Sequence, residues 1–144
     1  MANLIDAGLD TSVVLRLILG EPAGQSKAAM EALLRARRSG AMVIVSDLVA
    51  MEAYFALQTA YQVPKKEALA ALALMFDSGD IQPEPGGSAP AALNECLASA
   101  SKPGFVDRMI HAQYRRHGAR LMTFELAAGK MPGVKVLQPL ACDT

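Results

Sequence analysis

Short stretches rich in β-branched and aliphatic residues alternate along this chain with longer stretches of helical periodicity, and this alternation constrains the fold most. Strands are predicted at residues 4–9, 42–45, 81–83, 119–123 and 134–137. Helices are predicted at about 11–18, 26–38, 47–62, 64–76, 90–100 and 105–117. Ser46 and Asp47 are expected to cap the helix at 47–62, Pro64 to begin the next helix, and Gly118 to end the one at 105–117. Strands separated by helices pair in parallel through right-handed crossovers, with helices on both faces of the sheet. The pattern predicts an α/β protein, a three-layer α/β/α sandwich with a mainly parallel central sheet.

The length of the chain, 144 residues, fits one globular domain. A chain of this size buries roughly 68–70% of its unfolded surface in a single core. Hydrophobic residues make up 52% of the sequence and charged residues 19%. The Pro-Glu-Pro-Gly-Gly stretch at 83–87 is interpreted as a loop, because too little chain follows it to build a second core. We expect a single domain over residues 1–144.

Charge and hydropathy exclude several classes of protein. Lys plus Arg equals Asp plus Glu at 14 each, so net charge gives no general attraction to nucleic acid. The longest apolar run, 69–76, is far shorter than the roughly 20 residues that a membrane-spanning helix needs. No export signal is visible, and Cys96 and Cys142 have no disulfide or metal spacing. We expect a cytoplasmic protein without a membrane segment, in which any RNA contact is local.

Four acidic residues stand where the predicted fold could gather them. Asp10 follows the first strand and Glu125 follows the strand at 119–123, so both are expected at the carboxyl edge of one parallel sheet, where ligands bind. Glu52 lies in the helix after the second strand with the apolar residues Met51, Tyr54 and Phe55 around it, and we expect it to face inward. Asp107 begins the helix at 105–117, where the helix dipole favours a carboxylate.

Helix capping is the structural alternative for two of these acids. For Asp107 plain capping is the alternative to a functional role, whereas for Asp10 the following Thr11 and Ser12 already supply capping groups, which favours a functional role. Clustered carboxylates repel one another unless a cation lies among them, and hard oxygen ligands suit Mg²⁺ or Mn²⁺ better than zinc. Such a centre can activate water against a phosphodiester.

The acids lie in four segments, namely Gly-Leu-Asp-Thr-Ser-Val-Val (8–14), Ser-Asp-Leu-Val-Ala-Met-Glu (46–52), Gly-Phe-Val-Asp-Arg-Met-Ile (104–110) and Leu-Met-Thr-Phe-Glu (121–125). In this order they resemble the four acidic motifs of PIN domains, and in particular those of VapC-type toxins of bacterial toxin–antitoxin pairs. The resemblance covers nearly the whole chain. Glu125 is the clearest departure, since the family most often has aspartate there.

The resemblance implies a metal-dependent endoribonuclease, a hydrolase in which water attacks the RNA phosphate and leaves a 3′-hydroxyl and a 5′-phosphate. The residues that would hold one or two Mg²⁺ or Mn²⁺ ions are Asp10, Glu52 and Asp107, with Glu125 as the fourth acid. The hydroxyl residues that would orient carboxylates or a metal-bound water are Thr11, Ser12 and Thr123. The implied partners are a small antitoxin, whose C-terminal segment would cover the acidic pocket, and a second copy of the chain in a homodimer.

Other readings of the first motif are weaker. A haloacid-dehalogenase-like phosphatase needs a second aspartate two residues after the first, where this chain has Ser12. No phosphate-binding loop and no G-x-G-x-x-G follows the first strand, so nucleotide-binding folds are rejected. The serious alternative is a PIN fold whose acids have decayed and which is retained as a non-catalytic module that binds RNA or protein.

Basic residues and one histidine leave further alternatives open. Two basic patches could hold an RNA backbone or could be solvated helix faces: Arg35, Arg37 and Arg38 form one, and Arg108, Arg115, Arg116, His117 and Arg120 form the other. His111 lies four residues after Asp107, on the same helix face, which permits a ligand role. A structural role is favoured for it, because the family motif does not ask for a histidine.

Overall fold

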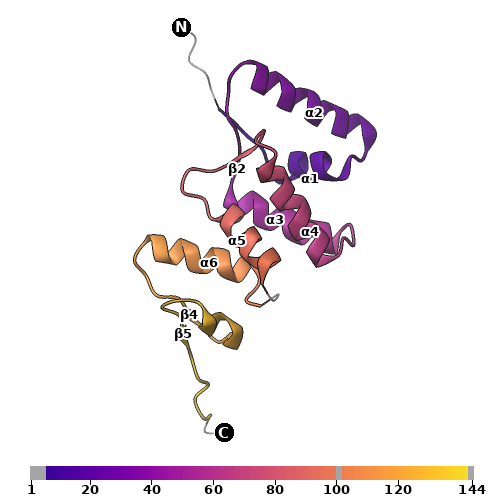
Figure 1. Cartoon of the computed structure of the whole chain (residues 1–144). Helices are drawn as coiled ribbons and strands as arrows, with labels where there is room; N and C mark the ends of the chain where they lie inside the picture. Colours follow the sequence, from indigo (N-terminus) through magenta and orange to yellow (C-terminus); the bar gives the residue numbers. More distant parts are fainter. Residues whose placement is uncertain (1–5, 100–101, 143–144) are drawn as a thin grey trace.

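The computed structural model describes residues 6–99 and 102–142, and Figure 1 shows its elements. The helices are α1 (Thr11–Leu19), α2 (Ala23–Arg38), α3 (Asp47–Thr59), α4 (Lys65–Asp77), α5 (Ala89–Ala98), α6 (Phe105–Arg116) and the 3₁₀ helix η1 (Leu126–Lys130). The strands are β1 (Ala7–Gly8), β2 (Val43–Val45), β3 (Gln82–Pro83), β4 (Met122–Thr123) and β5 (Lys135–Val136). Every predicted helix and strand is present with slightly different ends, and η1 is added. Residues 4 and 5 of the first predicted strand and residue 100 of the helix predicted at 90–100 lie outside the described residues.

The central sheet has the strand order β1-β2-β3, and both strand pairs are parallel. The middle strand, β2, carries Val43 and Val45, which are 2% and 1% exposed. Pro83 lacks a backbone N–H, which an edge strand such as β3 tolerates. Helices pack on both sides of these strands, so the predicted three-layer α/β/α arrangement is confirmed.

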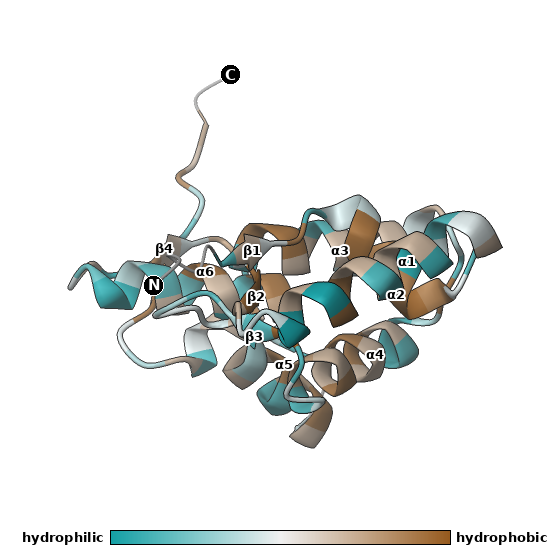
Figure 2. Ribbon diagram, turned by 90° about the horizontal axis from the view of Figure 1, so that it is seen from above, coloured by the Kyte–Doolittle hydropathy of each residue, from teal (hydrophilic) through white to brown (hydrophobic). Residues whose placement is uncertain are grey.

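The hydrophobic core lies between the helices and β2. Figure 2 shows hydrophobic residues concentrated on α1, α3 and α4 and around β2, while α2 and α6 are more hydrophilic. The ring of Tyr54 on α3 meets that of Phe105 on α6 edge to face, with centroids 5.1 Å apart. This contact joins the start of α6 to the main core. Among the described residues no helix has the length and hydrophobicity to span a bilayer.

Strands β4 and β5 form a separate two-stranded parallel sheet, which lies below α6 in Figure 1. The backbone N–H of Leu137 donates to the Thr123 carbonyl at 2.7 Å. A hydrogen bond of 2.7 Å joins His111 Nε2 on α6 to the carbonyl of Pro132 and ties this unit to the helix. Within the described residues β4 pairs with β5 alone, so the expectation that Asp10 and Glu125 leave the same edge of one sheet is wrong.

Candidate functional site

Asp107 and Glu125 line one cavity of about 550 Å³ at the start of α6. Asp107 lies in the first turn of α6, a helix whose N-cap is Gly104 and whose first turn receives no side-chain cap bond. Asp107 therefore makes no capping hydrogen bond, while its place in the first turn still lets the helix dipole stabilise its carboxylate. Glu125 precedes η1, and its backbone N–H donates to Thr123 Oγ1 at 3.0 Å. Thr123 thus fixes the backbone from which the second carboxylate projects.

Two lysines line the same cavity as the two carboxylates. Lys65 is the first residue of α4, and Lys102 lies in the loop before α6. Ammonium groups this near to carboxylates offset their mutual repulsion and also offer hydrogen-bond donors to a phosphate. The cavity therefore combines hard oxygen ligands with cations that can bind an anionic substrate.

Asp10 lies at the N-terminus of α1, where its own side chain is the cap. Its Oδ1 accepts hydrogen bonds from Ser12 Oγ at 2.7 Å and from the Val13 N–H at 3.1 Å. The Ser12 hydroxyl, followed by the Val13 N–H, holds the pKa of the Asp10 carboxyl below its usual value. The argument that Thr11 and Ser12 would cap the helix in place of Asp10 is therefore wrong. Asp10 stays ionised at neutral pH while it performs a structural task.

Glu52 is exposed on α3 and does not face inward as expected. The core-facing residues of this helix include Ala53, Tyr54 and Leu57, which are 0%, 5% and 0% exposed. Phe55, which was taken as an apolar neighbour on the buried side, is itself 49% exposed. Glu52 thus shares a solvent-facing surface with an aromatic residue.

The structure brings two of the four predicted acids together, since Asp10 and Glu52 do not line the cavity of Asp107 and Glu125. In residues 6–99 and 102–142 no group of three or more His, Cys, Asp or Glu side chains is placed to hold a metal. Two carboxylates are nevertheless a usual protein contribution to a Mg²⁺ site, because Mg²⁺ keeps several waters and takes further oxygens from substrate phosphates. Asp107 and Glu125 fit such a site.

Asp47 is a buried carboxylate, 9% exposed. The sequence indicated only that it caps the start of its own helix. Its oxygens accept hydrogen bonds from the Ser88 N–H at 2.9 and 3.0 Å and from the Ala89 N–H at 3.0 Å. Its own N–H donates to Glu84 Oε1 at 2.8 Å. A Cβ on Gly87 would lie 2.9 Å from Glu84 and 3.1 Å from Asp47 Oδ1, so the turn requires glycine there. Asp47 thus anchors the start of α5.

His111 is 7% exposed, and its Nε2 is engaged with the Pro132 carbonyl at 2.7 Å. The side chain joins α6 to the loop after η1, as the structural interpretation predicted.

A family model described as PIN domain matches residues 8–132 of this chain. The matched range includes Asp10, Glu52, Asp107 and Glu125, and it covers most of the 144 residues. A search of curated proteins found no match to the chain.

Proposed function

Because this chain belongs to the PIN-domain family, whose members are generally nucleases, we propose that it is a metal-dependent endoribonuclease. The observation that carries this proposal is the cavity in which Asp107 and Glu125 lie with Lys65 and Lys102. Carboxylates attract a hard divalent cation, and ammonium groups attract the phosphodiester on which that cation would act. Both requirements for phosphodiester hydrolysis are met by side chains of one cavity.

In this mechanism Asp107 and Glu125 would hold Mg²⁺ or Mn²⁺. The bound ion would supply an activated water and stabilise negative charge on the phosphate oxygens. Lys65 and Lys102 donate hydrogen bonds to those oxygens and position the phosphate. Thr123 keeps Glu125 in place through the 3.0 Å bond to its backbone N–H.

Asp10 and Glu52 are assigned to the same acidic set on the strength of their motifs. The lowered pKa of Asp10 keeps this side chain negatively charged over the whole neutral range, as a metal ligand requires. Ser12 and Thr11 adjoin Asp10 in sequence, and the Ser12 hydroxyl bonds directly to its carboxylate. Ser12 would therefore orient Asp10, and Thr11 is assigned a supporting role with it.

The physiological role that we propose is that of a toxin in a toxin–antitoxin pair, acting in the cytoplasm. The likeness of its motifs to VapC-type toxins supports this role. Several large apolar side chains are exposed on α3 and α4, with Leu48 at 76%, Phe55 at 49% and Leu74 at 70%. Surfaces of this kind commonly mark protein interfaces, which supports a homodimer and a small antitoxin as partners. Growth arrest on expression, relieved when the cognate antitoxin is expressed with it, is the expected outcome.

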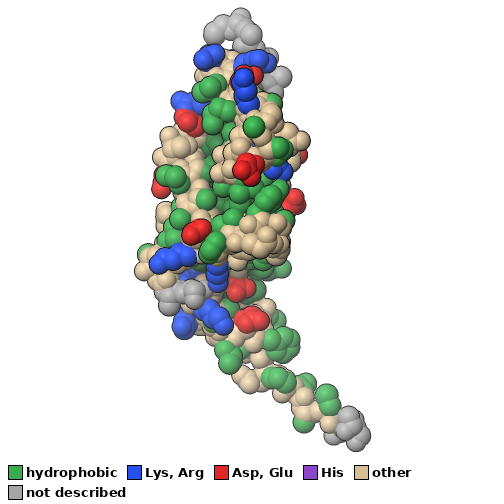
Figure 3. Space-filling view, turned by 90° about the vertical axis from the view of Figure 1, so that its right-hand side faces the viewer, with side chains coloured by type: hydrophobic (Ala, Val, Ile, Leu, Met, Phe, Trp, Pro, Cys, Tyr) green, Lys and Arg blue, Asp and Glu red, His purple; other side chains and the backbone are tan. Residues whose placement is uncertain are grey.

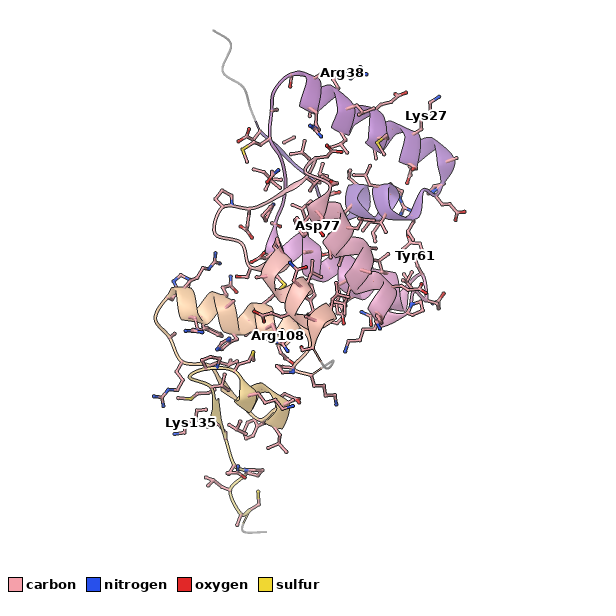
Figure 4. All side chains as sticks on the ribbon, viewed as in Figure 1. Lys27, Arg38, Tyr61, Asp77, Arg108 and Lys135 are labelled. Atoms are coloured by element: carbon pink, nitrogen blue, oxygen red, sulfur yellow. The ribbon has the colours of Figure 1, made fainter. Side chains whose placement is uncertain are left out.

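The enzymatic proposal is tested with purified full-length protein and a labelled mixed RNA substrate, in Mg²⁺ or Mn²⁺ and in EDTA. Asp107→Asn and Glu125→Gln are expected to reduce cleavage by at least roughly ten- to a hundredfold. Asp77→Asn is the matched control, since Asp77 is an exposed acid at the end of α4 (Figure 4). Cleavage that persists in EDTA, or that survives both substitutions, would refute the proposal.

The alternative function, a non-catalytic module, is favoured by one observation. Asp10 is occupied as a helix cap and Glu52 is exposed, so neither lines the cavity of the other two acids. On this alternative the folded protein binds RNA equally well with and without Mn²⁺ and cuts none. Calorimetric Mn²⁺ binding that disappears in Asp107→Asn would speak against it.

A further inference from the structure

Strands β1 and β4 are edge strands of two different sheets, and the outer edge of each is unpaired in the described part of the chain. The N–H groups of Ala7 and Leu9 donate to β2 at 2.8 and 2.9 Å, so the backbone of Gly8 between them faces the free edge of β1. The Thr123 carbonyl accepts from β5, so the backbone of Met122 faces the free edge of β4. Both edges offer an N–H and a carbonyl to a further parallel strand.

These two free edges do not meet within one copy of the chain. Figure 1 shows β4 and β5 on one side of α6, while β2, to which β1 is paired, lies on the other side of α5 and α6. Helix α6 is held at both sides, because Phe105 packs on Tyr54 and His111 bonds to the Pro132 carbonyl. A second copy can reach either edge without breaking these contacts.

The side chains of the two edges are complementary when the strands are aligned over their whole length. Each strand has two residues, so Ala7 stands opposite Met122, and Gly8 stands opposite Thr123. Met122 is 61% exposed, and it would extend the side on which Ala7 packs against the core. A Cβ on Gly8 would meet nothing within 4 Å, so there is space for Thr123 beside it. The outer edge of β3 is less suitable, because Pro83 lacks an N–H there.

The charges at the two ends of such a pair differ in their effect. Exposed Asp6 precedes β1 and exposed Arg120 precedes β4, so opposite charges lie at the starting end of parallel strands. At the other end the same alignment places Asp10 opposite Glu125, on strands about 4.8 Å apart. Two carboxylates at this spacing repel each other unless a cation lies between them. The pairing is therefore expected to depend on a cation.

Hydrophobic side chains also cover the part of the molecule that would make this contact. Figure 3 shows that the lower end, where Figure 1 places β4 and β5, is narrow and carries hydrophobic side chains on its surface. Besides Met122 these include Leu126, which is 78% exposed. An end of this shape can be covered by the surface of another molecule.

We propose that two copies of this chain associate by adding β4 of each copy in parallel to β1 of the other, with a divalent cation bridging Glu125 of one copy and Asp10 of the partner subunit. The bridging cation rests on the proposed function, which places a metal at Asp107 and Glu125. The cavity of these two acids thereby gains a third carboxylate, and the metal site is incomplete in a single copy. This interface is separate from the exposed apolar residues of α3 and α4.

The strand pairing is tested by disulfide formation in EDTA, with diamide as the oxidant, in a Cys142→Ser background that removes the exposed native thiol. Gly8→Cys protein is mixed with Thr123→Cys protein, and a covalent dimer is expected on a non-reducing gel, because opposite residues of neighbouring strands meet the distance that a disulfide needs. The matched control is Gly8→Cys mixed with Met122→Cys. Its side chain is more exposed but lies on the other face of the strand, so little dimer is expected.

The cation bridge is tested by sedimentation equilibrium of the unmodified protein in Mn²⁺ and in EDTA. A metal that couples to association typically changes an affinity about 5- to 150-fold, so the dimer dissociation constant is expected to fall by that factor in Mn²⁺. Asp10→Asn and Glu125→Gln each remove one side of the bridge, and their dissociation constants should not respond to Mn²⁺. Asp77→Asn, an exposed acid on α4, should respond like the unmodified protein. Circular dichroism of each variant establishes that it is folded.

Three results would overturn the inference: no disulfide between Gly8→Cys and Thr123→Cys, an equal yield with Met122→Cys, or an internal disulfide in a monomeric Gly8→Cys/Thr123→Cys variant. A dimer of the unmodified protein that ignores Mn²⁺ would also overturn it. Failure of the proposed function has a different signature, in which the disulfide and the Mn²⁺ response are present but no RNA is cut. Cleavage restored by mixing inactive Asp10→Asn with inactive Glu125→Gln supports both proposals, because one site of the mixed dimer keeps both acids.

Discussion

Replacement of Asp47 by alanine is expected to destabilise the fold more than replacement of any exposed acid. The carboxylate is 9% exposed and accepts hydrogen bonds from the N–H groups of Ser88 and Ala89, which begin a helix remote in sequence. The turn at Gly87 lies so close to Glu84 and Asp47 that it leaves no space for a side chain at position 87. Asp47→Ala therefore leaves two donors without an acceptor at the start of α5.

The magnitude follows from the two bonds. A hydrogen bond to a charged group contributes about 1.5–3 kcal/mol, so losing both costs roughly 3–6 kcal/mol. A domain of this kind has a free energy of unfolding of about 5–15 kcal/mol, so the loss is a large fraction of it. With a urea m value of about 2 kcal/mol/M, the unfolding midpoint falls by roughly 2 M.

Urea unfolding followed by far-ultraviolet circular dichroism measures the change. Asp47→Asn keeps an oxygen at the Oδ1 position, which accepts from both N–H groups, so it should lose only about 1–2 kcal/mol. Asp77→Ala, an exposed acid on α4, should stay within about 0.5 kcal/mol of the unmodified protein. A loss below about 1 kcal/mol in Asp47→Ala would refute the view that this carboxylate anchors α5.

Three further measurements test other parts of the structure. The lowered pKa of Asp10 means that its ionised form stabilises the folded state, and this contribution is lost as the pH falls below about 4. The urea midpoint of the unmodified protein should therefore fall more steeply between pH 6 and pH 2.5 than that of Asp10→Asn, whose neutral cap does not titrate; parallel curves would contradict this. Burial raises the pKa of the Cys96 thiol, so iodoacetamide at pH 7.5 should label exposed Cys142 first and Cys96 only on unfolding, as intact-mass spectrometry would show. Phe105→Ala should lower the free energy of unfolding by about 3–5 kcal/mol, because this ring is 1% exposed and packs on Tyr54; a loss below about 1.5 kcal/mol in a urea titration would speak against it.

Local patterns were sufficient for most secondary structure. Ser46 begins α3 as predicted, because its hydroxyl accepts from the Val49 N–H at 3.2 Å, an interaction wholly contained within four residues. Pro64 stands directly before α4, and Gly118 follows the end of α6, where the sequence placed these boundaries. Helix ends depend on such short-range bonds, whose partners lie close together in the sequence, and they can therefore be predicted from the sequence.

Side-chain facing and long-range partners were not predictable in the same way. Glu52 was expected inward because Tyr54 and Phe55 are apolar, yet only Tyr54 faces the core and Phe55 lies with Glu52 on the exposed side. Asp47 receives its hydrogen bonds from residues 41 and 42 positions away. Neither the rotation of a helix about its axis nor a contact of that span is encoded in the local pattern.

The position of Glu125 shows when the rule that parallel strands end at one edge of a sheet does not apply. The carboxyl ends of parallel strands meet at one edge only if the strands share a sheet, and β4 pairs with β5 in a sheet of its own. Asp10 and Glu125 therefore leave different sheets. Glu125 instead lines one cavity with Asp107, which lies in the first turn of α6. Which acids share a cavity is thus set by the placement of residues 124–127 beside the start of α6.

The two basic patches of the sequence differ in their surroundings, and this difference also comes from long-range packing. On α2, Arg37 forms an ion pair with Asp80, whereas Arg115 on α6 faces a groove to which Lys102 and Lys130 are brought from other segments. Charges interact over about 10 Å at 0.1 M salt, so a phosphate responds to the cations of its own groove and not to the net charge of the chain. Although the chain is neutral overall, an RNA bound in this groove would therefore show a salt dependence set by the few cations there.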